Sequence, residues 1–362
     1  MSTPSVPGGG PEQPADAATP SRPPRRVTIA AIAAEAGVSV PTVSKVLNGR
    51  SDVARATRAR VEEVMARHQY KRRSRGPSPS GPPLVDLVFH EMESEWALEI
   101  VRGVETTLAD LGASVVLTAS EGKHRPGQQW LDGVLARRPL GVILVMSTLT
   151  SNQREQLESR AIPFVALDTD GEPPAGVPAV GSTNWDGGMA ATRHLIELGH
   201  RRIAVISGPK DVLCSRARVD GFRSAHERAG LGYDPDLIRW GDFYIAGGYE
   251  HAMELLSRPD RPTAIFAGAD MQAVGVLRAA RELGLSVPRD LSVVGYDNLP
   301  LADWFSPRLT TVNQPLQAMA KTATSMMLTL AEGKQPPALR VDLATDLVVR
   351  ESTAPRPHGV RS

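Results

Sequence analysis

The chain has 362 residues, with 41 Lys and Arg, 40 Asp and Glu, and a single cysteine, Cys214. This length allows two or three domains with cores of their own, and one cysteine excludes a disulfide framework and a cysteine-rich zinc site. No run approaches the roughly 20 apolar residues of a membrane helix, and residues 1–26 contain no apolar stretch typical of a secretory signal. We therefore expect a soluble, cytoplasmic protein.

The net charge of +1 conceals an uneven distribution of charge. Residues 21–75 hold 13 basic and four acidic side chains, a net charge of +9, whereas the remainder holds 28 basic and 36 acidic side chains, a net charge of −8. A small basic module on a larger acidic body is typical of proteins that bind nucleic acid. Charge alone does not decide the matter, because a solvated charged face is the alternative.

The amino-terminal region divides into a tail, a compact module and a linker. Residues 1–26 are rich in Pro, Gly, Ala and Ser, which predicts a disordered tail. Residues 27–71 have the apolar periodicity of short helices, which predicts a folded domain. Residues 72–83 are basic and then rich in Pro, Ser and Gly, which predicts a linker.

The module itself has the signals of three helices. Thr28 is placed to cap a first helix, and Gly37 supplies the left-handed residue of a tight turn. Ser39 is placed to cap a second helix with Pro41 in its first turn, and a third helix is expected at about 55–68. Helix, short turn, helix and supporting helix predict a helix-turn-helix. The alternative is a small three-helix packing domain without DNA binding.

From residue 84 onward, short apolar runs such as LVDLVFH and IPFVALD alternate with helical patterns, which predicts βαβ units and parallel sheets. The alternation starts again after residue 182 and predicts two lobes with a cleft between them. We expect the first lobe at about 84–182 plus 313–332 and the second at 183–312 plus 333–353, followed by a disordered tail at 354–362. Ligands of such sheets bind beyond the carboxyl ends of the strands.

The run VTIAAIAAEAGVSVPTVSKVLNG, followed by TRARVEEVMARHQY, closely resembles the DNA-binding domain of the LacI/GalR family of bacterial transcriptional regulators. The runs ELGHRRIAVISGP, RARVDGF, AIFAGADMQAVGVLRAARELGLSVPRDLSVVGYDN and LTTVNQP resemble the sugar-binding core of that family, which is similar to periplasmic sugar-binding proteins. The resemblance covers about residues 27–353. It implies an all-α helix-turn-helix DNA-binding domain joined to a two-lobed α/β periplasmic-binding-protein-like core with parallel sheets.

The resemblance also implies contacts with DNA. The base-reading pair of the family falls on Val40 and Pro41, and the next groove-facing position falls on Lys45. Val40 suits a thymine methyl group, Lys45 suits a guanine edge, and Pro41 offers no hydrogen bond. Polar side chains suited to phosphates or to the helix ends complete the predicted set: Thr28, Ser39, Thr42, Ser44, Asn48 and Tyr70.

Two departures from the family pattern stand out. Ala54 occupies the position where the family usually has a hydroxyl residue to cap the third helix. The stretch RRSRGPSPSGPP replaces the hinge helix of the family and contains no leucine to enter the minor groove. Arg72 and Arg73 are expected to supply positive charge to the minor groove or to phosphates, with a plain basic linker as the alternative.

The predicted ligand site gathers side chains at strand ends. His90, Glu91 and Trp96 follow the first strand of the core, and Asp168 follows the fourth. By resemblance, Arg218 matches an arginine that binds sugar hydroxyls, Asp270 a strand-end carboxylate and Phe243 a ring that stacks on the sugar. Asp297 lies in the GYDN turn. Such a set suits a polyol, although an ion pair within a loop or a capped turn would use the same residue types.

These residues predict a homodimeric DNA-binding regulator: a nucleoid-associated repressor of carbohydrate-utilisation genes that a mono- or oligosaccharide releases from its double-stranded operator. The alternative is a corepressor-dependent regulator that senses a nucleoside or purine. We expect no enzyme, cofactor, metal or membrane partner, because the chain has no G-x-G-x-x-G after a strand, no P-loop, no H-E-x-x-H and no G-x-S-x-G. A transport binding protein would share the core but not the basic module.

Overall fold

The structure is a computed structural model. It describes residues 28–47, 53–68, 70, 82–92, 94–120, 124–169, 171–173 and 175–356. These residues form two units, one within residues 1–74 and one within residues 75–362, which we call the head and the core. The predicted tail at 1–26 and most of the predicted linker lie outside the described residues.

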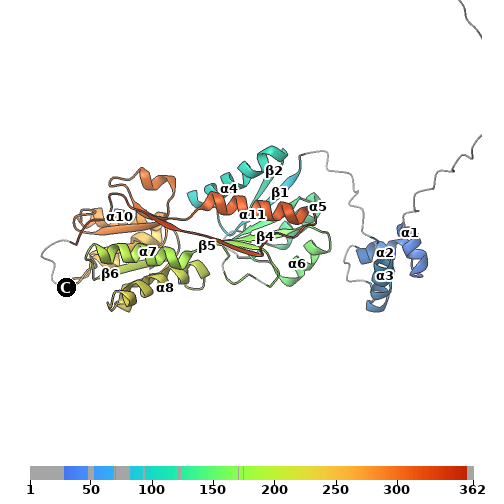
Figure 1. Cartoon of the computed structure of the whole chain (residues 1–362), viewed down its shortest axis with the longest axis horizontal. Helices are drawn as coiled ribbons and strands as arrows, with labels where there is room; N and C mark the ends of the chain where they lie inside the picture. Colours follow the sequence, from blue (N-terminus) through green and yellow to red (C-terminus); the bar gives the residue numbers. More distant parts are fainter. Residues whose placement is uncertain are drawn as a thin grey trace, which may run out of the picture. The chain divides into compact units, whose positions relative to one another are not determined.

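The head consists of three short helices: α1 (Ile29–Glu35), α2 (Val40–Leu47) and α3 (Arg55–Arg67) (Figure 1). Gly37, with φ of +62°, makes the turn between α1 and α2, a conformation that L side chains rarely adopt. Small apolar side chains from all three helices form the core of the head: Ile32, Ala33, Ala36, Val43, Val46, Val61 and Val64. Burial of this stripe, rather than helix propensity alone, stabilises helices this short.

The first lobe of the core is a parallel sheet with the strand order β11-β5-β4-β3-β1-β2. Helices α4 and α11 pack on one face of the sheet, and α5 and α6 pack on the other. Neighbouring residues of β1 divide between the two faces, which is why this strand reads as a continuous apolar run. The elements are β1 (Leu84–Phe89), α4 (Glu95–Leu108), β2 (Ser114–Ala119), α5 (Gln128–Arg137), β3 (Gly141–Val145), α6 (Ser151–Glu158), β4 (Phe164–Leu167), β5 (Ala179–Ser182), α11 (Leu316–Ala331) and β11 (Arg340–Leu343).

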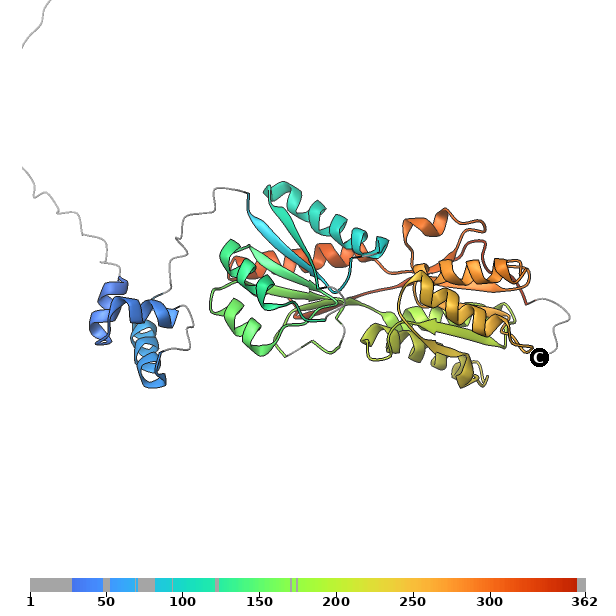
Figure 2. The same ribbon diagram turned by 180° about the vertical axis from the view of Figure 1, so that it is seen from behind.

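The second lobe repeats this plan with the strand order β12-β10-β9-β8-β6-β7, and only the edge strand β12 is antiparallel. Helices α7 and α8 pack on one face, and α9 and α10 pack on the other (Figure 2). The prediction of two lobes with parallel sheets is therefore confirmed. The elements are α7 (Asn184–Glu197), β6 (Ile203–Ser207), α8 (Leu213–Arg228), β7 (Ile238–Trp240), α9 (Ile245–Leu256), β8 (Ala264–Ala267), α10 (Asp270–Glu282), β9 (Ser292–Asp297), β10 (Thr310–Asn313) and β12 (Asp346–Val348).

Three segments of the chain cross between the lobes: β5 to α7, β10 to α11, and β11 to β12. The first and third are tied together by Thr183 and Thr345. The hydroxyl groups of these threonines lie 3.1 Å apart, and the Thr345 amide donates to Thr183 Oγ1 at 3.0 Å. The Thr183 amide in turn donates to the carbonyl of Leu343 at 2.9 Å. These crossings place the carboxyl ends of both sheets toward each other.

Two predicted boundaries need correction. The sequence predicts residues 333–353 in the second lobe, but β11 pairs with β5 in the sheet of the first lobe, and β12 alone of the two strands joins the second sheet. The predicted disordered tail began at residue 354, yet the Ala354 carbonyl accepts a hydrogen bond from His200 at 3.1 Å, and the Arg356 amide donates to the Leu198 carbonyl at 2.9 Å. Both errors arise because long-range pairing, which local periodicity does not report, determines these positions.

Candidate functional site

The outer face of α2 in the head presents the predicted base-reading positions. Val40 is 46% exposed, and Pro41 and Lys45 are also exposed. Val43 and Val46 point into the core of the head. A helix that is locked on one side and bears small side chains at the start of its other side can approach the edges of base pairs in a major groove.

A shallow groove lies beside the starts of α2 and α3. Its lining combines hydroxyl groups with two basic side chains and comprises Val38, Ser39, Thr42, Lys45, Val53, Ala54, Thr57 and Arg60. The Thr42 amide donates to Ser39 Oγ at 3.3 Å, so Ser39 caps α2 as predicted, whereas Ala54 provides no side-chain cap for α3. Hydroxyl groups, cations and helix starts are the groups that hold DNA phosphates.

The remaining head residues of the predicted set are placed differently. Thr28 Oγ1 accepts a hydrogen bond from the Ala31 amide at 3.3 Å and so caps α1. Tyr70 packs against the core of the head, and Ser44 is half-buried. Asn48, Arg72 and Arg73 lie outside the described residues. Contact of any of these residues with DNA stays a prediction.

In the core, a cavity of about 310 Å³ lies between the two lobes. Seven of the predicted ligand residues line it: His90, Glu91, Trp96, Asp168, Arg218, Phe243 and Asp297. Side chains that the sequence reasoning did not select also contribute to the lining: Phe89, Ser94, His124, Val145, Met146, Pro209, Val212, Cys214, Asp242, Tyr244, Ala269 and Met271. The volume and the mixture of rings and polar groups are those of a small-molecule site.

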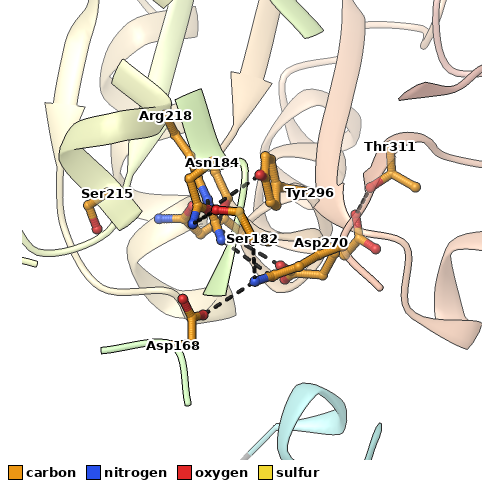
Figure 3. Close-up of polar contacts among 12 residues, drawn as sticks. Asp168, Ser182, Asn184, Ser215, Arg218, Asp270, Tyr296 and Thr311 are labelled. Atoms are coloured by element: carbon orange, nitrogen blue, oxygen red, sulfur yellow. Dashed lines mark hydrogen bonds and ion pairs between the residues drawn. The ribbon is translucent and has the colours of Figure 1, made fainter. Parts of the chain in front are cut away.

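Arg218, on α8, is the centre of the polar network beneath this cavity (Figure 3). Its side chain is 3% exposed, and Nε donates to Asn184 Oδ1 at 2.9 Å, while Nη1 donates to the Gly268 carbonyl. The guanidinium also lies 3.7 Å from the centre of the Tyr296 ring. Because its position is held from several sides, the guanidinium presents its remaining N–H groups in a preorganised direction.

The same network reaches the first lobe through Gln314, in the second crossing. Arg218 Nη2 donates to Gln314 Oε1 at 3.4 Å, and Gln314 Nε2 donates to Asp168 Oδ2 at 3.3 Å and to Ser182 Oγ at 3.0 Å. A continuous chain of hydrogen bonds therefore joins the arginine of one lobe to the carboxyl group of the other.

The carboxyl groups of the cavity are deeply buried. Burial raises the pKa of Asp168 and of Asp297, although the positive charge of Arg218 opposes this effect. Asp297 lies 3.9 Å from Arg218, measured from Oδ1 to Nη1. Burial also raises the pKa of the Cys214 thiol to about 12, so this cysteine is not a nucleophile at neutral pH.

Flat rings face the cavity from both lobes. Phe243 lies in the second lobe, with its ring centre 5.7 Å from the Arg218 guanidinium carbon. In the first lobe, His90 and His124 stack in parallel, with ring centres 4.0 Å apart and planes at 2°. Tyr244 Oη donates to Glu91 Oε2 and joins the lobes at the cavity wall. Rings can cover the C–H faces of a sugar or the plane of a base.

Three lining residues hold their backbone in the left-handed region although they are not glycine: Met146 (φ 46°), Asp168 (φ 48°) and Asp297 (φ 107°). Each lies at the carboxyl end of a strand that points toward the cavity. Such strained conformations cluster at binding sites, because they aim a side chain that a regular strand would direct elsewhere.

Comparison with known proteins gives a consistent answer for both units. The family model "Bacterial regulatory proteins, lacI family" matches residues 28–73, and "Periplasmic binding protein-like domain" matches residues 192–353. The HTH-type transcriptional regulator CelR of Thermobifida fusca is 35% identical over 341 residues, which cover 91% of this chain and 98% of the relative. The chain belongs to the lacI family of bacterial regulatory proteins.

Other lacI-family proteins match over a similar length. The HTH-type transcriptional repressor PurR of Edwardsiella ictaluri is 33% identical over 333 residues, which cover 91% of this chain and 98% of PurR. A CelR–cellobiose complex has a TM-score of 0.67 at 33% identity and covers 90% of this chain and 100% of its own. The Lac repressor dimer bound to operator and the anti-inducer ONPF has a TM-score of 0.65 at 29% identity, with 91% and 100% covered.

One predicted ligand residue of this lacI-family core is misplaced. Asp270 is fully buried and does not line the cavity. Its Oδ2 accepts from the Leu299 amide at 2.8 Å, and its Oδ1 accepts from Thr311 Oγ1 at 2.6 Å. Asp270 therefore joins the loop after β9 to β10, and the structure does not place it with the other predicted ligand residues around the cavity.

Some of the lining residues that were missed carried a usable signal. His124 lies in the loop after β2, and Met146 directly follows β3, so the rule that selected His90 after β1 applies to both. Asp242 and Tyr244 flank the predicted Phe243. Cys214 and Val212 precede or begin α8 and had no such signal, because the side chains that face the cavity there depend on how α8 packs.

Among the described residues, no single helix is long and apolar enough to cross a membrane, although the bent pair Ile29–Glu35 and Val40–Val46, at 101°, matches a span in length and composition alone. No group of three or more His, Cys, Asp or Glu side chains in the part of the chain that the structure describes could hold a metal ion.

Proposed function

We propose that this lacI-family regulator represses carbohydrate-utilisation genes and that an uncharged saccharide bound in the cavity lowers its affinity for the operator. Two copies bind a near-palindromic operator, each with α2 in a major groove. When a ligand draws the two lobes together, the amino-terminal end of β1, the first strand of the core, moves relative to the same strand of the second copy. Coupling of about 1–3 kcal/mol changes DNA affinity by about 5–150-fold.

The observation that carries the proposal is the lining of the cavity. Ring faces lie on both walls, and Arg218 is accompanied by four carboxyl groups: Glu91, Asp168, Asp242 and Asp297. Arg218 is the single Lys or Arg among the described lining residues, and its N–H groups are largely engaged. A phosphorylated ligand would meet this excess of carboxyl groups, whereas hydroxyl groups can donate to them and accept from Arg218.

The test compares uncharged sugars with a phosphorylated sugar. Thermal unfolding of the full chain is measured with cellobiose, glucose and glucose 6-phosphate, followed by calorimetric titration. We expect an uncharged saccharide to raise the melting temperature, because a ligand that binds only the folded state stabilises it by mass action. Glucose 6-phosphate should have no effect. A stronger response to the phosphorylated sugar would reject the proposal.

A purine or nucleoside corepressor is the second candidate. Repressors named PurR match 91% of the chain at 33% identity, and Phe243 together with the stacked histidines can enclose a flat base. The sign of control separates the candidates. A sugar should weaken operator binding, whereas hypoxanthine or guanine acting as a corepressor should strengthen it, as fluorescence anisotropy with a labelled duplex would report.

The DNA side is tested with a duplex selected by the protein from random sequences. Lys45→Ala should reduce the preference for this duplex over a scrambled one by about 5–100-fold, because a side chain that reads a base edge contributes about 1–3 kcal/mol of discrimination. Binding to the scrambled duplex provides the internal control. Equal weakening on both duplexes would show that Lys45 contacts only phosphate.

A further inference from the structure

Gln272, on α10, is a buried amide beneath the loop that carries Phe243. Its side chain is fully buried. Nε2 donates to two backbone carbonyls, that of Ser207 at the end of β6 (3.2 Å) and that of Asp242. One side chain therefore joins the end of β6, the start of α10 and the Phe243 loop.

The amide of Gln272 is only partly satisfied. Its Oε1 is buried and has no hydrogen-bond partner among the described residues. Leaving a buried acceptor unpaired costs about 1–3 kcal/mol, and an apolar side chain of the same length would avoid this cost. Flipping the amide would place its oxygen against two carbonyl oxygens, so the orientation of the amide is fixed. The two hydrogen bonds from Nε2 are therefore what this side chain contributes.

Other contacts also fix the conformation of the loop that carries Phe243. The Gly241 amide donates to the Ser207 carbonyl at 3.0 Å, and the Tyr244 amide donates to Asp242 Oδ1 at 2.9 Å. The Phe243 ring lies against Gly208, where an added Cβ would come within 2.2 Å of the ring. The ring thus fills the space that a side chain would occupy at Gly208, the residue directly after β6.

From this arrangement we infer that Gln272 is the positioning residue for Phe243: its amide holds the Asp242 carbonyl and thereby sets the tilt of the ring against the cavity. Gln272 does not itself line the cavity. Because the ring is fixed before a ligand arrives, the ligand does not bear the entropic cost of ordering it. The inference builds on the proposed function, in which Phe243 stacks on the saccharide.

The first test needs no ligand. Hydrogen exchange of the full-length protein is followed by mass spectrometry in peptides covering residues 238–248. We expect Gln272→Met, which keeps the length but removes the amide, to speed exchange at Gly241 and Tyr244 about tenfold or more. Gln272→Asn keeps the amide on a shorter side chain and should also speed exchange at these two amides. It serves as the second variant in case Gln272→Met perturbs folding. Unchanged exchange in both variants would overturn the inference.

The matched control is Gln153→Met in the first lobe. Gln153 is also a buried amide whose Nε2 donates to a backbone carbonyl, that of Pro126, at 2.7 Å. Its side-chain oxygen also accepts from the Thr150 amide at 2.9 Å, so its loss should destabilise the first lobe, but it should leave exchange in 238–248 unchanged. Equal acceleration in both variants would show a general loss of stability rather than positioning.

The second test is a double-mutant cycle with cellobiose as the probe. Gln272→Met should weaken cellobiose binding about three- to tenfold in the wild-type background but less than about 1.5-fold after Phe243→Ala, because the ring it positions is gone. Equal weakening in both backgrounds would contradict the inference. If Phe243→Ala alone leaves binding unchanged, or cellobiose does not bind, the proposed function fails instead, and hydrogen exchange still decides the role of Gln272.

Discussion

The two walls of the cavity are built differently. In the second lobe, Arg218 and Asp297 are 3% and 6% exposed and Tyr296 is fully buried, and all belong to one network of polar and ring contacts. In the first lobe, the side chains of His90 and Glu91 are 21% and 32% exposed and lie on the segment after β1. The polar centre of the second wall is therefore preorganised, and Asp168 of the first wall shares this network through Gln314. The segment of the first wall that carries His90 and Glu91 is more exposed, and we expect this part of the wall to adjust.

This contrast suggests a division of labour within one site. A preorganised wall supplies affinity, because its groups need not be ordered when the ligand binds. An adjustable wall can change with little effect on the fold and so sets which ligand is preferred. Substitutions on the two walls should therefore differ in the property they change, ligand affinity or ligand preference, as well as in the size of the change.

The largest effect is expected from Arg218→Ala. It leaves Asp168 and Asp297 without their buried cation, which typically destabilises a protein by about 3–5 kcal/mol, and it should weaken saccharide binding by at least about 100-fold. Calorimetry and urea unfolding measure the two effects. Arg216→Ala, on the exposed side of the same helix, is the matched control. If both variants respond normally to the ligand, the second wall does not dominate affinity.

The buried carboxyl groups behind the second wall should make stability depend on pH. Burial raises the pKa of Asp270 from 3.8 to about 7, so the native state holds a proton that the unfolded state releases. The free energy of unfolding should therefore fall as pH rises from 3.8 to 7, by up to about 1.4 kcal/mol per pH unit. Asp270→Asn should reduce this slope in urea unfolding between pH 4.5 and 7.5, and the other buried carboxyl groups, Asp168 and Asp297, should account for the slope that remains. An unchanged slope would show that Asp270 does not hold the proton.

A smaller effect is expected where the walls meet. Tyr244→Phe removes the hydroxyl group that donates to Glu91 across the lobes. One such hydrogen bond contributes about 0.5–1.5 kcal/mol, so saccharide affinity should fall about two- to tenfold, mainly through faster dissociation in stopped-flow measurements. Tyr233→Phe, on a tyrosine that does not line the cavity, should change nothing.

The smallest effect on affinity should come from the first wall. His124→Ala removes one ring of the stacked pair and should alter binding of any one saccharide by about two- to fivefold, with stability changed by less than about 1 kcal/mol. Its signature is a changed order of preference among saccharides in competition titrations. His251→Ala, outside the cavity, is the control. A loss as large as that of Arg218→Ala would erase the contrast between the walls.

Local signals in the sequence were sufficient for the architecture and for much of the site. The glycine at 37 and the serine at 39 mark the turn and the cap of the head, and both have the predicted role. The strand-end rule led to Asp168 and Asp297, because in a parallel sheet the position after a buried strand opens toward the cleft whatever lies elsewhere.

What the sequence left open depended on distant partners. Asp270 begins α10 three residues after β8 ends, and its carboxyl group bonds the Leu299 amide and the Thr311 hydroxyl instead of lining the cavity. Gln272 reads as an ordinary helix residue until Ser207 and Asp242 are seen beside it. The return of β11 to the first sheet is equally nonlocal, since nothing in RVDL states which edge it joins.

The paired threonines at positions 183 and 345 have one more consequence. Their hydrogen bonds join two of the three segments that connect the lobes, so these two segments form one unit. We expect one lobe to rotate about these joined segments rather than slide past the other lobe. Ligand binding would then produce one defined rotation between the lobes. We expect substitutions that remove the Thr183–Thr345 contacts to weaken the effect of the ligand on DNA binding while leaving ligand affinity nearly unchanged.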